Sequence, residues 1–83
     1  MKDLVALTEN LVKALVQNPD AVSVKAFDAD EAGEVTIQVI VASDDMGRVI
    51  GHGGKTANAI RTIVRASGYL AELPRFNINF DAV

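Results

Sequence analysis

The chain has 83 residues, no cysteine and a formal net charge of −3, and 49% of its residues are hydrophobic. This length allows one small domain over residues 1–83, and the lack of cysteine excludes disulfides and thiolate metal sites. Its apolar runs are too short to span a membrane, and charged residues interrupt the N-terminal segment, so we expect a soluble cytoplasmic protein without membrane contact.

The N-terminal segment is expected to be a helix from Asp3 to Gln17. Its leucines recur on one helix face, Asp3 is placed as an N-cap, and Asn18-Pro19-Asp20 ends the helix. Further valines widen the apolar face beyond what a surface helix on a small domain needs, namely Val5, Val12 and Val16. Two interpretations stay open: these valines pack at the edge of the core, or they form a homodimer or partner surface.

Two strands are expected next, over residues 22–27 and from Glu34 to Val41, where apolar and polar residues alternate. The acidic connector over residues 28–33 ends in Gly33, so the strands should form a hairpin. The acids of this connector do not follow the ligand pattern of a calcium loop. We therefore expect a solvated turn and no metal site.

Two helices and a last strand complete the predicted order αββααβ. Ser43-Asp44-Asp45 supplies N-cap chemistry for a short helix from about Asp45 to Ile50. A second helix should run from Gly54 to about Ser67, where Gly68 is a natural stop. Apolar residues alternate with asparagines in the segment that forms the last strand, namely Phe76, Ile78 and Phe80.

Between the two helices lies the loop Gly51-His52-Gly53-Gly54. Its glycines remove side chains, so the loop amides can approach a ligand closely. The following helix directs unpaired amides and the positive end of its dipole toward the loop. This arrangement is typical of a phosphate-binding site.

The charge around this loop is opposite in sign to that of the whole chain. None of the 11 acidic residues lies between Met46 and Ala71. That span holds four of the eight lysines and arginines: Arg48, Lys55, Arg61 and Arg65. The loop is therefore locally basic although the chain is acidic.

Spacing decides among three kinds of glycine-rich phosphate site. A P-loop would need a glycine at Val49 and a preceding strand, and neither condition is met. A dinucleotide fingerprint starting at Gly51 would need its third glycine at Thr56, and the chain is too short for that domain. A G-x-x-G loop between two short helices fits, and in KH domains such a loop clamps the backbone of about four nucleotides.

The segment Val49–Ile60 resembles the KH signature, and the order αββααβ resembles the type II, or prokaryotic, KH fold. Residues 44–51 more narrowly resemble small bacterial single-KH proteins of the KhpA type. The resemblance covers nearly the whole chain and implies an α+β fold, a three-stranded sheet with helices on one face. It also implies an RNA-binding protein regarded as an RNA chaperone. Such proteins pair with themselves and with a larger KH-domain RNA-binding protein, and are linked to cell-wall synthesis, cell shape and cell length.

The expected RNA site contains nine residues: Arg48, Ile50, Gly51, His52, Gly53, Gly54, Lys55, Asn58 and Arg61. The loop amides would face phosphate oxygens, and Lys55 and Arg48 can reach a phosphate. For Ile50 two roles stay open, a groove floor that supports a base or ordinary core. Arg65, more than a turn further along the helix, is expected to be a solvated surface residue.

Two features predict weak binding. His52 and Gly53 occupy middle loop positions that are commonly basic in strong RNA binders, although a neutral histidine still donates a hydrogen bond. The chain has no tryptophan, and its one tyrosine, Tyr69, lies outside the loop, so stacking is not expected to compensate. Weak binding by one domain makes a dimer or a partner useful.

Other classes of function are less well supported. With one histidine and no cysteine the chain offers little for an active site, so we expect neither an enzyme nor a cofactor. The serious alternative is a dimerisation scaffold with a KH fold and little RNA contact, which the apolar first helix and the acidic net charge favour. Single-stranded DNA also stays open as a ligand, because a backbone clamp alone does not read the 2′-hydroxyl.

Overall fold

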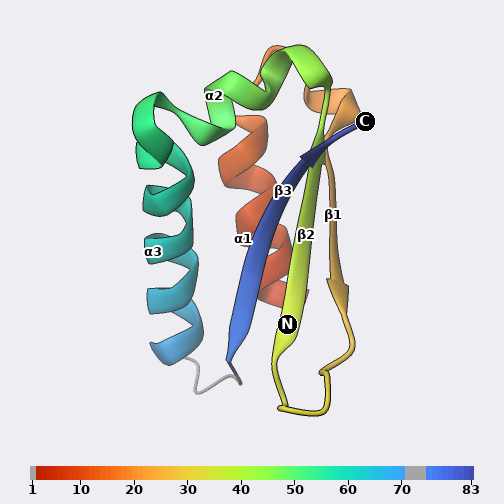
Figure 1. Ribbon diagram of the computed structural model, residues 1–83, viewed down its shortest axis with the longest axis vertical. Coiled ribbons are helices and arrows are strands. Elements are labelled where there is room, and N and C mark those ends of the chain that lie inside the picture. Colours follow the sequence, from red (N-terminus) through yellow and green to blue (C-terminus); the bar gives the residue numbers. More distant parts are fainter. Residues whose placement is uncertain (1, 71–74) are drawn as a thin grey trace.

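The computed structural model describes residues 2–70 and 75–83 and consists of helices packed on a three-stranded sheet (Figure 1). In chain order the elements are α1 (Lys2–Lys13), β1 (Ser23–Phe27), β2 (Val35–Val41), α2 (Met46–Ile50), α3 (Lys55–Leu70) and β3 (Phe76–Ala82). Short 3-10 turns occur at Pro19–Ala21, Ser43–Asp45 and His52–Gly54. The predicted order αββααβ and the α+β class are confirmed.

The sheet has the strand order β1-β2-β3, with β2 in the centre. β1 and β2 pair antiparallel, which confirms the predicted hairpin, whereas β2 and β3 run parallel. Ile37 of β2 pairs with Ala26 on one side and Ile78 on the other. Because paired residues point to the same face, the strands share one apolar face and one polar face.

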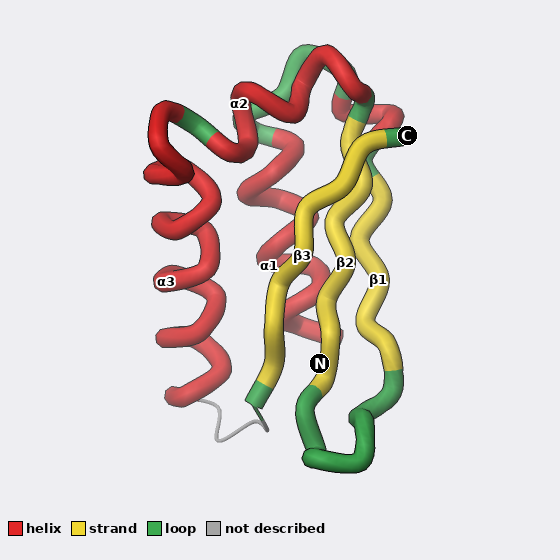
Figure 2. Tube along the Cα trace, viewed as in Figure 1, coloured by secondary structure: helices red, strands yellow, loops and turns green. Residues whose placement is uncertain are grey.

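The helices cover only the apolar face of the sheet (Figure 2). α1 and α3 lie along this face, and α2 crosses its end (Figures 1 and 2). The buried core joins residues from every helix, from β2 and β3, and from Val22 just before β1: Leu4, Val12, Val22, Val35, Ile37, Val39, Val41, Val49, Ile60, Val64, Phe76 and Ile78. In the described part of the chain, no helix has the length and apolar character needed to cross a bilayer.

The first helix is shorter than predicted. It begins at Lys2, so Asp3 lies in its first turn and is not its N-cap, and it ends at Lys13 rather than Gln17. The backbone N–H groups of Gln17 and Asn18 donate to the Asp45 carboxylate at 3.1 and 3.0 Å. Because these two amides donate to Asp45, they do not donate to carbonyls four residues earlier, so they do not continue the helix.

The buried residues of α1 are Leu4, Thr8 and Val12, whereas Leu7 and Leu11 are only partly buried. Thr8 is accommodated because its hydroxyl donates to the Leu4 carbonyl at 2.7 Å. Val12 is fully buried and Val16 packs against the core, which agrees with the edge-of-core interpretation of the valines. Leu15 lies beyond the helix end and stays 41% exposed.

The prediction that Gly68 ends the third helix is wrong, because α3 continues to Leu70. Gly68 is buried where α3 meets the rest of the core. A Cβ there would lie 2.6 Å from the Phe76 ring and 3.2 Å from the Leu4 side chain. The glycine is needed for close packing rather than for a helix stop.

Candidate nucleic-acid interface

The glycine loop is a tight turn between α2 and α3. The Gly51 N–H donates to the Gly47 carbonyl at 2.9 Å, and the Gly54 N–H donates to the Gly51 carbonyl at 3.3 Å. The backbone φ angles are +76° at Gly51, +63° at Gly53 and +80° at Gly54, which L side chains rarely adopt. The glycines are thus required by the backbone path of the loop.

Gly51 is also required by close packing against the start of α3. A Cβ at this position would lie 2.2 Å from the Thr56 hydroxyl oxygen and 2.9 Å from the Thr56 backbone nitrogen. Gly53, in contrast, has no atom within 4 Å of the place its Cβ would take. The loop is therefore held on the side of Gly51 and open on the side of Gly53.

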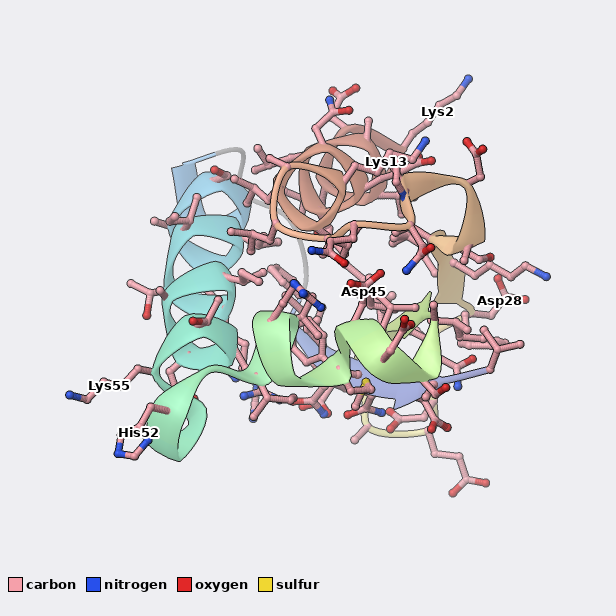
Figure 3. All side chains as sticks on the ribbon, turned by 90° about the horizontal axis from the view of Figure 1, so that it is seen from above. Lys2, Lys13, Asp28, Asp45, His52 and Lys55 are labelled. Carbon is pink, nitrogen blue, oxygen red and sulfur yellow. The ribbon has the colours of Figure 1, made fainter. Side chains whose placement is uncertain are left out.

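The open part of the loop faces away from the body of the protein. His52 and Lys55 project outward at the end of the molecule where α2 meets α3 (Figure 3). Both residues and Gly53 are exposed. A ligand phosphate can therefore approach the loop backbone, the imidazole and the ammonium group from solvent, at the N-terminus of α3.

Arg48, which we predicted as a phosphate contact, makes internal hydrogen bonds within the start of α2. Its guanidinium donates to the Asp44 carbonyl at 3.0 Å and to the Asp45 carboxylate at 3.2 Å. Its side chain is 41% exposed, but its charge is paired with a buried carboxylate. The free positive charge near the loop is therefore smaller than the sequence suggested.

Asp45 joins the start of α2 to the segment that follows α1 by hydrogen bonds. It occupies the N-cap position of α2, but its side chain does not cap that helix. Its fully buried carboxylate accepts hydrogen bonds from the backbone amides of Gln17 and Asn18 and from the Asn18 side chain at 2.9 Å. Burial by itself raises the pKa of this carboxyl, but these hydrogen bonds and the Arg48 charge outweigh burial, so its pKa lies below the ordinary value.

Two predicted site residues on α3, Asn58 and Arg61, contact each other, and Arg61 also contacts β3. The Asn58 side-chain nitrogen lies 4.0 Å from where a Cβ on Gly54 would be, and the Asn58 side-chain oxygen accepts from Arg61 at 3.2 Å. Arg61 in turn donates through Nε to the Ile78 carbonyl of β3 at 3.3 Å. A continuous run of polar groups thus leads from the loop to β3.

Ile50 and Arg65 take contrasting positions. Ile50 is partly buried and packs against the core, so its side chain serves the core whether or not it also supports a ligand. Arg65 is exposed on α3, beyond Arg61, as expected for a surface residue. Two residues that contact the expected site residues were missed: Asp45 was interpreted only as a helix cap, and Phe80 only as an alternating residue of the last strand. Alternation in the last strand placed Phe80 on the inner face, but nothing in the sequence paired it with Arg61.

A G-x-x-G loop between two helices, set on a sheet with these strand directions, defines a type II KH domain. Residues 5–72 match the protein family described as "KhpA/KhpB, KH domain". The chain belongs to this family.

Several relatives support this assignment, and each is called "RNA-binding protein KhpA". The protein of Caldanaerobacter subterraneus subsp. tengcongensis is 46% identical over 61 residues, which cover 74% of this chain and 79% of the relative. That of Mycobacterium tuberculosis is 43% identical over 65 residues, covering 78% and 79%. That of Streptomyces coelicolor is 48% identical over 60 residues, covering 72% and 73%.

The fold is also similar to part of the solved structures of Era. Aquifex aeolicus Era matches with a TM-score of 0.72, and an Era complex with nucleotides 1506–1542 of 16S ribosomal RNA matches with 0.73. In each case the match covers 96% of this chain but only 30% of the Era chain, at 15% sequence identity. This similarity concerns the fold alone.

Proposed function

We propose that this protein binds single-stranded RNA and holds the sugar-phosphate backbone at the loop Gly51-His52-Gly53-Gly54 and the first turn of α3. The observation that carries the proposal is the glycine loop at the N-terminus of α3, exposed at His52 and Gly53, next to the exposed side chain of Lys55. Loop amides and a helix N-terminus bind phosphate oxygens without reading the base. The names of the relatives agree with RNA as the ligand.

The wider role follows from the family. We propose an RNA chaperone that acts in the cytoplasm, pairs with a second copy or with a larger KH-domain RNA-binding protein, and affects cell-wall synthesis and cell length. A single weak site gains from such pairing, because two linked sites raise the effective concentration of the second contact. The chaperone activity, the partners and the cellular process all rest on family resemblance.

A charge reversal in the loop tests the site. The double substitution H52D/G53D places two carboxylates beside the bound phosphates and should abolish RNA binding by like-charge repulsion. Gly53 has open space for a side chain, and aspartate tolerates its positive φ better than most residues, so the fold should persist.

The matched control is H52N/G53N, which has nearly the same shape without the charge. Crosslinking of each variant to cellular RNA, followed by sequencing, measures the effect. The control should keep most of the crosslinking signal. If the aspartate variant crosslinks as well as the wild type, the loop is not the RNA site.

The second candidate function is a protein-interaction scaffold. Large apolar side chains are exposed at several places in the described residues: Leu15, Phe27, Ile63 and Val83. Sedimentation at micromolar concentration tests self-association, and we expect a species of twice 8.8 kDa. A clean monomer would count against the homodimer. A dimer that crosslinks to no RNA would favour the scaffold over the RNA-binding protein.

A further inference from the structure

Arg61 is fixed in one orientation by three contacts from two elements. Its Nε donates to the Ile78 carbonyl at 3.3 Å, and its Nη1 donates to the Asn58 side-chain oxygen at 3.2 Å. Its guanidinium carbon lies over the Phe80 ring, 5.2 Å from the ring centre. Two hydrogen bonds and one cation–π contact hold a side chain that would otherwise have many rotamers.

None of these three partners carries a charge. A carbonyl, an amide oxygen and an aromatic ring orient the guanidinium but do not neutralise it, in contrast to Arg48 with its buried carboxylate. Arg61 and Phe80 are both partly exposed, so this positive group is within reach of solvent. An oriented and still charged guanidinium is suited to a ligand outside the protein.

The position of this group matches the path of a strand held at the glycine loop. Arg61 lies about 9 Å along the helix axis from Lys55, at the rise of an α-helix. Asn58 connects the two places, since its side chain lies next to Gly54 at one end and contacts Arg61 at the other. About four nucleotides clamped by a G-x-x-G loop extend over such a distance.

We propose that Arg61, stacked on Phe80, forms a platform on which a nucleobase of the bound strand stacks. The guanidinium carbon lies over the Phe80 ring and Arg61 is partly exposed, so the side of the guanidinium that faces solvent can receive a base. The chain has no tryptophan, so the platform supplies a stacking contact that tryptophan cannot provide here. The proposal rests on the proposed function, because the base belongs to the strand that the loop holds.

The test compares each protein variant on two ligands, a short oligoadenylate RNA and the same RNA with abasic positions in its centre. The measured quantity is the ratio of the two dissociation constants within one variant. A variant that is partly unfolded binds both ligands less well, so this ratio is insensitive to stability. R61K keeps the charge without the plane, F80L keeps the apolar packing without the ring, and R65K is the matched control on the same helix face.

For the wild type we expect the abasic RNA to bind about tenfold more weakly than the intact RNA, because it lacks the base that stacks. R61K should lower this ratio to nearly one, F80L should lower it partly, and R65K should leave it unchanged. A wild-type ratio kept by R61K and F80L would overturn the platform, as would a wild type that binds both RNAs equally. A fall in R61K affinity for both RNAs by the same factor would make Arg61 a phosphate contact and would also overturn it.

The outcome separates the platform from the loop. Equal binding of both RNAs by the wild type, with loss of both in H52D/G53D, removes the platform but keeps RNA binding at the loop. Failure of the wild type to bind either RNA removes both proposals.

Discussion

At the scale of single residues, two features of Gly51, its backbone conformation and its close packing, explain why the loop has a fixed shape. Its backbone adopts a positive φ, and the Thr56 side chain fills the space that a Cβ would need. Gly53 shares the positive φ but not the crowding. The two glycines therefore differ both in backbone conformation and in the room for a side chain.

G51A should destabilise the protein much more than G53A. Gly53 has φ +63° and ψ +21°, where alanine costs about 1–2 kcal/mol, whereas Gly51 has φ +76° and ψ 176°, a region open essentially to glycine alone, where the strain is about 1–3 kcal/mol. In G51A the clash with Thr56 adds about 1–3 kcal/mol, as in an overpacked core. Urea unfolding of the two variants measures the difference in free energy. Equal losses for both would mean that Thr56 moves aside without cost.

At the scale of elements, Asp45 joins the segment after α1 to the start of α2. Its carboxylate accepts hydrogen bonds from the backbone amides of Gln17 and Asn18, which follow α1, and from the side chains of Asn18 and Arg48. The helix that leads into the glycine loop is thus attached to the N-terminal helix by one buried charge. Protonation of that charge weakens all of these contacts together.

Acid should therefore destabilise this connection. The pKa of Asp45 is below its ordinary value of 3.8 in the folded protein, so below that value the unfolded chain binds more protons. The stability that Asp45 contributes is present above about pH 4 to 5 and is lost as the pH falls through the folded pKa. Thermal melts between pH 6 and pH 2.5 measure this loss.

The variants D45N and D44N provide the comparison. D45N should melt at a lower temperature at neutral pH and change less with acid than the wild type. D44N, at the exposed neighbouring carboxylate, should retain the acid dependence of the wild type. If D45N and the wild type lose stability in parallel, another group is responsible.

The elements and the loop could be predicted from the sequence because their signals are local. Alternation gives the strands, glycine spacing gives the loop, and both are read within a few residues. The length of α1 could not be predicted, because the amides of Gln17 and Asn18 bind a carboxylate far along the chain. For the same reason Gly68 was interpreted as a helix stop, although its neighbour Phe76 comes from another element.

For the candidate site, the sequence predicted the location of the loop but not the contacts of Arg48 and Arg61. The residues of the loop and Lys55 are exposed where the spacing indicated. The pairing of Arg48 with Asp45 is local, three residues apart, but it was missed because Asp45 was interpreted only as a helix cap. The contact of Arg61 with Phe80 could not be anticipated, because it depends on how α3 packs against β3. These contacts change the expected charge and chemistry of the site, not its location.

At the scale of the whole molecule, an acidic protein carries basic residues along α3, beginning next to the glycine loop. The net charge is −3, while the exposed face of α3 contributes lysine and arginine near the loop. On the proposed function, long-range attraction to RNA should therefore be weak, and binding should depend on a few close contacts. Few phosphate charges are neutralised, so the salt dependence should be shallow.

The slope of log affinity against log salt measures the number of phosphates contacted. Each contact contributes about −0.7 on a single strand, so a site of two or three contacts gives a slope of about −1.4 to −2. K55Q should make this slope less negative by about 0.7, and D20N, far from the loop in the chain, should not change it. An unchanged slope in K55Q would mean that Lys55 contacts no phosphate.

The parallel pairing of β2 with β3 has a consequence for the newly made chain. The hairpin of β1 and β2 joins neighbouring segments and can form early, whereas β3 must return across the whole connection of α2, loop and α3. Contacts between segments distant in the chain form slowly, because the loop must close before they are gained. The glycine loop lies inside this connection, so docking of β3 sets the time at which a nascent protein becomes able to bind its ligand.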